Sequence, residues 1–107
     1  MNMITKLKSK LPWFLRREKN CSHISLIRPV DPDLRGCEQC LETGDTWVHL
    51  RVCLICGHVG CCDNSKNKHA TGHFRTTGHP LIQSGQPGED WIWCYEDEIM
   101  LPGTFAQ

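Results

Sequence analysis

The stretch CLICGHVGCCDNSKNKHATGHFRTTGHPL, residues 53–81, decides how this chain folds. It begins with a Cys-x-x-Cys pair, Cys53 and Cys56, and ends with three histidines, His69, His73 and His79. A Cys-x-x-Cys turn is the shortest sequence element that presents two thiolates to one zinc ion, and neutral imidazoles are also good zinc ligands. The stretch therefore predicts a metal site around which the fold is built.

The number of ligands indicates two such sites. A second Cys-x-x-Cys pair lies upstream, and each pair needs two further ligands, which Cys61 and the three histidines supply. Spacing alone leaves the pairing open, although His69 and His73, four apart on a helix, would share a face. Sequential filling gives one site of Cys37, Cys40, Cys53 and Cys56 and another of Cys61, His69, His73 and His79. Interleaved filling gives sites of Cys37, Cys40, Cys61 and His69 and of Cys53, Cys56, His73 and His79.

Size and composition favour metal sites over disulfides. The chain has 107 residues, enough for one domain, and its 39% hydrophobic content includes eight cysteines, so the apolar core alone is thin. The early apolar run LPWFL, 11–15, is shorter than the hydrophobic stretch of a signal peptide, and we expect no transmembrane segment. The sequence therefore predicts a cytoplasmic protein whose cysteines bind zinc, since cytosolic thiols stay reduced.

Charge divides the chain near residue 20. Residues 1–20 carry six lysines and arginines against Glu18, a net charge of +5, whereas residues 21–107 carry six basic and eleven acidic residues, a net charge of −5. We therefore expect a basic N-terminal extension, 1–20, followed by one domain, 21–107. The extension suggests contact with RNA, a membrane surface or an acidic partner, or else a solubilising segment.

Hydrophobic patterning outlines the elements of the domain. Strands are expected where hydrophobicity alternates or a short apolar run occurs, at 46–52, 79–84 and 91–95. Residues 66–77 are expected to form a helix. Asn64 or Ser65 would cap its start, and Gly78 would end it in the left-handed conformation.

These motifs resemble those of a known family. The series CSH, CEQC, CLICGHVGC, HATGHFRTTGHPL and WCY, from residue 21 to about 98, is similar to the UBP-type zinc finger. That finger is the ubiquitin-binding module of certain deubiquitinases and of a histone deacetylase. The fuller stretch, from GHVGCCDNS through PGEDWIWCYEDE, looks like the small stand-alone versions of bacteria. The resemblance implies interleaved ligands and an α+β fold, in which cross-braced zinc sites hold a small twisted antiparallel sheet and one main helix.

The resemblance also implies a third zinc site. In three-zinc members of the family, a Cys-x-His pair near the start joins a later Cys-x-x-Cys pair on one ion. Cys21 and His23 match the first pair and Cys94 matches the third ligand, but the fourth position is Asp97 instead of cysteine. A carboxylate also ligates zinc, so the ligand set stays chemically complete. The alternative is a site without metal, with Cys21 and Cys94 buried as small apolar side chains.

The last expected strand carries the candidate ligand-binding residues. Trp91, Trp93 and Tyr95 fall on the face opposite Cys94, either as a binding surface or as core. In ubiquitin-binding relatives, the positions that Trp93 and Tyr95 resemble line a pocket for the free Gly-Gly carboxyl terminus of ubiquitin. Those relatives grip the carboxylate with an arginine, and this chain has Asp63 at that position. A protein or peptide partner is therefore expected, but a ubiquitin tail is not.

No catalytic residue is expected. A catalytic zinc keeps an open coordination position, and the first two predicted sites are filled by protein ligands. Cys62, His49 and His58 are left over, and are expected to be an inert buried cysteine and two surface histidines. Two other functions compete with peptide binding. One is nucleic-acid binding through the basic extension, which the acidic domain disfavours, and the other is redox sensing by labile thiolates.

Overall fold

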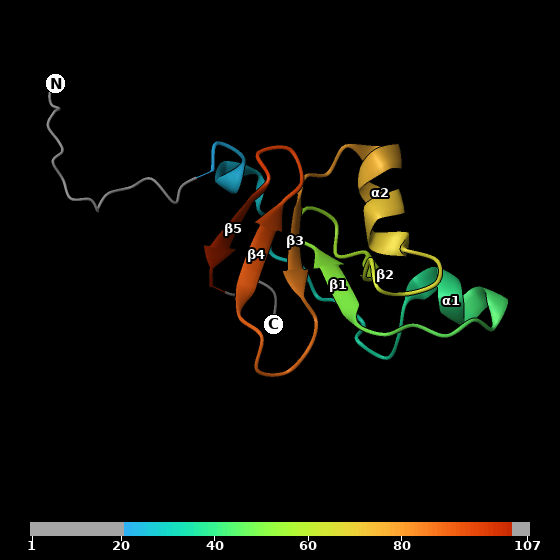
Figure 1. The fold of residues 1–107 in the computed structure, drawn as a ribbon. Helices are drawn as coiled ribbons and strands as arrows, with labels where there is room; N and C mark the ends of the chain where they lie inside the picture. Colours follow the sequence, from blue (N-terminus) through green and yellow to red (C-terminus); the bar gives the residue numbers. More distant parts are fainter. Residues whose placement is uncertain (1–20, 104–107) are drawn as a thin grey trace, which may run out of the picture.

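The computed structural model describes residues 21–103 (Figure 1), so the predicted basic extension, 1–20, lies outside the described residues. The elements begin with a 3-10 turn, η1 (Ile24–Leu26), helix α1 (Glu38–Thr43) and strands β1 (Leu50–Cys53) and β2 (Val59–Cys61). They continue with helix α2 (His69–Thr77) and strands β3 (Leu81–Ser84), β4 (Trp91–Cys94) and β5 (Ile99–Pro102). The fold class is the expected α+β, with one antiparallel sheet and one main helix.

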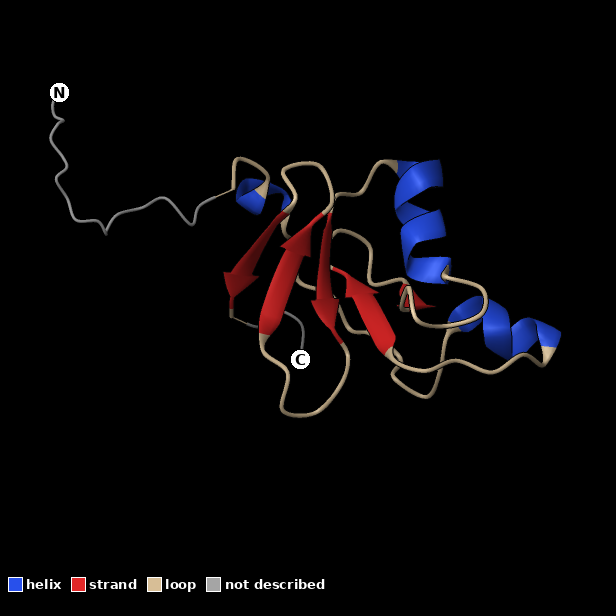
Figure 2. Ribbon diagram, in the orientation of Figure 1, coloured by secondary structure: helices blue, strands red, loops and turns tan. Residues whose placement is uncertain are grey.

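The five strands form a single antiparallel sheet in the order β2-β1-β3-β4-β5. Figure 2 shows α2 beside the β1–β2 end, α1 beyond it, and η1 near the β4–β5 end. The apolar core is small, and its five largest fully buried side chains are Leu54, Leu81, Ile92, Val52 and Val59. Five cysteines belong to the same buried cluster, so cysteines complete the thin core that the composition predicts.

Strand β1 is shorter than the stretch predicted from residues 46–52. Val48 donates its backbone N–H to the Ser65 hydroxyl at 2.9 Å instead of to a neighbouring strand, and the residue is 53% exposed. The ladder therefore begins at Leu50, which pairs with Cys61 of β2. The predicted strands at 79–84 and 91–95 correspond to β3 and β4, each trimmed at an end.

Helix α2 starts later than predicted. Its first residue is His69 instead of residue 66, because Lys68 takes a left-handed conformation (φ 53°) at the N-cap. Neither Asn64 nor Ser65 caps the helix, and the backbone N–H of His69 instead donates to the Cys61 sulfur at 3.2 Å. The predicted end is confirmed, since Gly78 (φ 78°) donates its N–H to the carbonyl of Phe74.

Strand β2 and helix α2 approach so closely that only glycine fits at position 60. A Cβ on Gly60 would lie 2.7 Å from the backbone nitrogen of Ala70 and 2.9 Å from its Cα. Gly60→Ala should push α2 off the sheet and lower the free energy of unfolding by about 1–3 kcal/mol. Gly72→Ala is the matched control, because a Cβ there meets nothing within 4 Å and helix propensity improves. Thermal melts compare the two variants, and a Gly60→Ala domain as stable as wild type would contradict the close contact.

Candidate metal centres

Twelve side chains gather into three clusters of four, and within each cluster the ligand atoms all lie within 4.8 Å of one another. The first cluster is Cys37, Cys40, Cys61 and His69; the second is Cys53, Cys56, His73 and His79; the third is Cys21, His23, Cys94 and Asp97. The structure thus brings together the interleaved sets and not the sequential ones. All eight cysteines lie among the described residues, and none forms a disulfide.

The first cluster ties α1 to β2 and α2. Cys37 precedes α1 and Cys40 lies in its first turn, while Cys61 ends β2 and His69 begins α2. The Nδ1 atom of His69 lies 3.2, 3.4 and 3.6 Å from the sulfur atoms of Cys37, Cys40 and Cys61. A sulfur and a nitrogen ligand on one tetrahedral zinc, with bonds of about 2.3 and 2.0 Å, stand about 3.5 Å apart. The atoms are therefore spaced as ligands of a single ion.

The second cluster joins the turn after β1 to α2. Gly57 (φ 84°) closes this turn by donating its N–H to the carbonyl of Cys53 at 2.9 Å. The sulfur of Cys56 lies 3.3 Å from Nε2 of His73, and the sulfur of Cys53 lies 3.6 Å from Nδ1 of His79. His73 follows His69 by one helical turn but belongs to another cluster, so α2 is braced at two points.

Burial sets the protonation of these ligands. It raises the pKa of the Cys37 thiol to about 12 and that of the Cys53 thiol to about 11, so a zinc ion has to displace a proton from each. Burial, followed by the charges of His58 and His79, lowers the pKa of His73 to about 4. His73 is therefore the neutral imidazole that metal binding needs.

His58 is not the surface histidine that the sequence predicts. Its half-buried ring stacks on His73, with ring centroids 4.0 Å apart and an interplanar angle of 3°. Its Nε2 lies 3.0 Å from the amide oxygen of Gln39 in α1. Its role is to hold the ring of His73 in place. The spacing of the candidate ligands in the sequence does not predict this role.

The third cluster lies at the other end of the sheet, where residues just before η1 meet β4. The Nδ1 atom of His23 lies 3.4 Å from the sulfur atoms of both Cys21 and Cys94 and 3.2 Å from Oδ2 of Asp97. A hydrogen bond from the Cys21 thiol lowers the pKa of Asp97, so its carboxylate is charged at neutral pH. The other imidazole nitrogen, Nε2, lies 2.9 Å from the carboxylate of Glu96, which orients the ring. The substitution of Asp97 for cysteine therefore keeps a donor set that suits zinc.

The clusters share no residue, so their metals should be separable. Cys94→Ala is expected to remove the zinc of the third cluster and to leave the other two ions in place. Asp97→Cys is expected to hold the third ion more tightly, because thiolate is a softer donor than carboxylate. Native mass spectrometry counts the ions in both variants. A Cys94→Ala protein with an undiminished zinc count would show that Cys94 is not a ligand.

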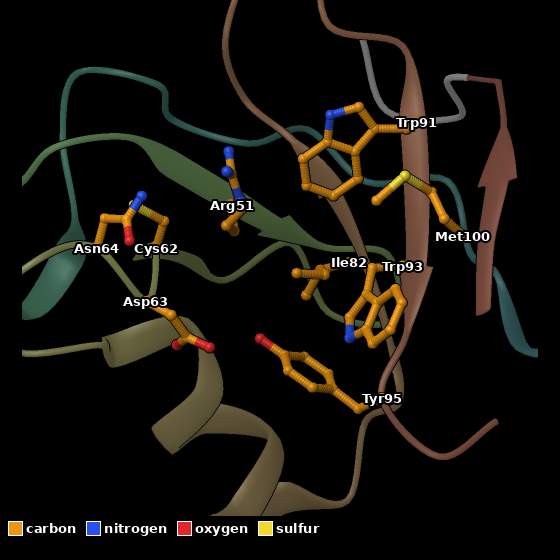
Figure 3. Close-up of a pocket in the computed structure, with 9 residues that line it drawn as sticks. All are labelled: Arg51, Cys62, Asp63, Asn64, Ile82, Trp91, Trp93, Tyr95 and Met100. Atoms are coloured by element: carbon orange, nitrogen blue, oxygen red, sulfur yellow. The ribbon is translucent and has the colours of Figure 1, made fainter. Parts of the chain in front are cut away.

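Trp91 and Trp93 of β4, with Tyr95 directly after the strand, lie on the side opposite Cys94 and open onto a pocket of about 230 Å³ (Figure 3). The three rings are half-buried, whereas Ile92 and Cys94 are fully buried. The row therefore forms a wall of the pocket and is not core. Cys62, buried as expected, also lines this pocket.

Asp63 lines the pocket from the loop between β2 and α2. The hydroxyl of Thr71 donates to Oδ1 of Asp63 at 2.6 Å and lies 3.2 Å from the hydroxyl of Tyr95. The ring of Tyr95 stacks on Phe74 of α2, with centroids 4.6 Å apart and an interplanar angle of 8°. Packing against α2 thus fixes both polar groups at this end of the pocket.

Arg51 is a pocket residue that the motif comparison does not assign. Its guanidinium carbon lies 4.7 Å from the centroid of the Trp91 ring, and its Nη1 donates to the carbonyl of Leu50 and lies 3.6 Å from the carboxylate of Glu89. The alternation of apolar and polar residues along β1 is the sequence signal that could have identified it. Leu50 and Val52 are buried on one face, so Arg51 points to the other, where the aromatic row lies.

Sequence comparisons with known proteins support a zinc-binding domain. Residues 37–102 match the family described as Zn-finger in ubiquitin-hydrolases and other protein. The chain is 36% identical over 104 residues to human Ubiquitin carboxyl-terminal hydrolase 45, covering 76% of this chain and 12% of that protein. It is 34% identical over 76 residues to NAD-dependent deacetylase sir2A of Dictyostelium discoideum, covering 69% of this chain and 14% of that protein. The chain thus spans only a small part of these curated relatives.

The chain spans a much larger share of one solved structure. The solution NMR structure of Protein RPA1320 from Rhodopseudomonas palustris is 57% identical, with a TM-score of 0.71, over 78% of this chain and 81% of that chain. No helix in residues 21–103 combines the length and the hydropathy that crossing a membrane requires. The family match and the three Cys- and His-rich clusters show that the chain belongs to the UBP-type zinc-finger family and carries a zinc-binding domain.

Proposed function

We propose that this chain is a non-catalytic module, residues 21–107, that binds a peptide segment of a protein partner in the pocket of Trp91, Trp93, Tyr95 and Asp63. The observation that carries the proposal is the aromatic row, which opens onto a pocket instead of filling the core. Fingers of this family mediate protein or ubiquitin interactions, which supports the same assignment. Eight cysteines without a disulfide suit the reducing cytoplasm.

The role of the metals in this proposal is structural. Each cluster supplies four ligand side chains, which fill the coordination of a tetrahedral zinc and leave no position for a reactive water. The first two ions hold α1, the turn after β1 and α2 together, and α2 in turn carries the Thr71 and Phe74 contacts of the pocket. Zinc thus builds the binding surface without taking part in chemistry.

The charges around the pocket argue against a free carboxylate as the ligand. Among the described residues, Arg51 is the one cation that lines it, but its charge is offset by Glu89 and its face is covered by Trp91. Asp63 then leaves the surroundings of the pocket net negative. A peptide that ends in free Gly-Gly would bring a second carboxylate towards Asp63, whereas an amidated or internal segment would not.

Replacing one ring tests whether the pocket binds peptide. Trp93→Ala is expected to weaken binding of a peptide that ends in Gly-Gly amide by about tenfold or more, because buried aromatic contacts dominate such interfaces. Leu41→Ala is the matched control, since it truncates an exposed apolar side chain of α1 outside the pocket. Calorimetric titration measures both affinities. An unchanged affinity of Trp93→Ala would contradict the proposed site.

A further inference from the structure

Resting on the proposed function, we propose that the pocket selects a positively charged group of its ligand, an ammonium or a guanidinium, with Asp63 as the counter-ion. The cation would lie between the Asp63 carboxylate and the rings of Trp93 and Tyr95. Figure 3 shows these three side chains around the end of the pocket that lies away from Arg51 and Trp91.

The Tyr95 hydroxyl and the Asp63 carboxylate present hydrogen-bond acceptors at this end of the pocket. Thr71 uses its single hydroxyl hydrogen on Oδ1 of Asp63, so the contact between the hydroxyls of Thr71 and Tyr95 needs the hydrogen of Tyr95. The Tyr95 oxygen therefore offers only lone pairs to a ligand, as the Asp63 carboxylate does. Ammonium and guanidinium groups are pure donors, whereas a carboxylate is a pure acceptor.

Asp63 is available for such a partner. Its side chain is exposed, and within residues 21–103 no lysine, arginine or histidine forms an ion pair with it. The hydrogen bond from Thr71 engages one carboxylate oxygen and holds the group in place. A ligand cation thus finds a carboxylate that is already oriented and lacks a cationic partner among the described residues.

The aromatic row favours the same class of ligand. Cations are attracted to the faces of tryptophan and tyrosine rings, and the chain's own Arg51 guanidinium lies over Trp91 at 4.7 Å. Trp93 and Tyr95 extend the row towards Asp63. A volume of about 230 Å³ suits a single side-chain head group better than a larger ligand.

The test uses three acetylated Gly-Gly probes that differ only at the end, which is a free carboxylate, a primary amide or a 2-aminoethyl amide with its ammonium group. Calorimetric titration of the wild type is expected to rank the ammonium probe first and the carboxylate probe last, about tenfold or more apart. Asp63→Asn should bring the ammonium probe to the affinity of the amide probe. Asp31→Asn, the same change at an exposed aspartate outside the pocket, should preserve the ranking.

The outcomes separate this inference from the function on which it rests. Equal affinities for the three probes, or a preference for the carboxylate, would overturn the cation assignment while leaving peptide binding in place. A ranking that survives Asp63→Asn would also overturn it, because the counter-ion would lie elsewhere. Failure of all three probes to bind would instead contradict peptide binding in this pocket.

Discussion

Cys53→Ser and His79→Ala are each expected to abolish cooperative folding of the domain. Both side chains belong to the second cluster, which joins the turn after β1 to the end of α2. A structural zinc contributes on the order of 10–16 kcal/mol of apparent binding free energy, and a whole domain has a net stability of about 5–15 kcal/mol. Losing the ion therefore removes about as much free energy as the net stability of the whole domain.

Thermal melts followed by circular dichroism measure this effect, alongside the zinc content of each variant. Cys62→Ser is the matched control, because Cys62 is buried like Cys53 but lies in none of the clusters. It should keep its zinc and a cooperative transition. A Cys53→Ser or His79→Ala domain that melts like wild type would mean that the residue is not a ligand.

Asp63→Arg is expected to create affinity for a peptide that ends in a free Gly-Gly carboxylate. The substitution replaces a repulsive charge on the pocket wall with the cation that ubiquitin-binding relatives use. Charge pairs at interfaces shift binding by about 2–5 kcal/mol when buried, and the exposure of Asp63 favours the lower end. About 2 kcal/mol corresponds to a gain of roughly 30-fold.

Calorimetric titration with the free and the amidated peptide measures the gain. Asp31→Arg makes the same change of charge away from the pocket and should leave both affinities near those of wild type. Tight binding of the free carboxylate by the wild type would mean that Arg51 grips it despite Glu89, and our exclusion of ubiquitin-type tails would be wrong.

The candidate ligands could be named from the sequence because metal sites impose local spacing. Two Cys-x-x-Cys turns and a run of histidines identify donors without any knowledge of the fold. Their pairing is a property of the fold, however. His69 and His73 are one turn apart on α2 and suit a shared ion, yet the helix lies between two clusters and gives one to each. Spacing within a helix could not show this.

What the sequence could not show arises from tertiary contacts. Helix α2 starts late because Lys68 is left-handed and the backbone N–H of His69 donates to the Cys61 sulfur, so neither Asn64 nor Ser65 caps the helix. Strand β5 has the sequence IMLP, which shows no alternation of apolar and polar residues and ends in Pro102, so the sequence pattern does not predict it. The stacking of His58 on His73 depends on the turn after β1 folding back onto α2.

Motif comparison could not predict that Arg51 lies in the pocket either. Alternation along β1 places it on the face opposite the core, but only the sheet order β1-β3-β4 brings that face beside Trp91. The pocket therefore combines residues from strands that are distant in sequence, and its balance of charge follows from the assembled sheet.

Native mass spectrometry of the zinc-loaded chain tests the central claim, that zinc ions brace this binding module, most directly. We expect the folded species to carry three zinc ions, one for each cluster. A mass that corresponds to two ions would mean that the Cys21 cluster does not bind zinc, while the two clusters that brace α2 still do. A folded species with one ion or none would contradict the account.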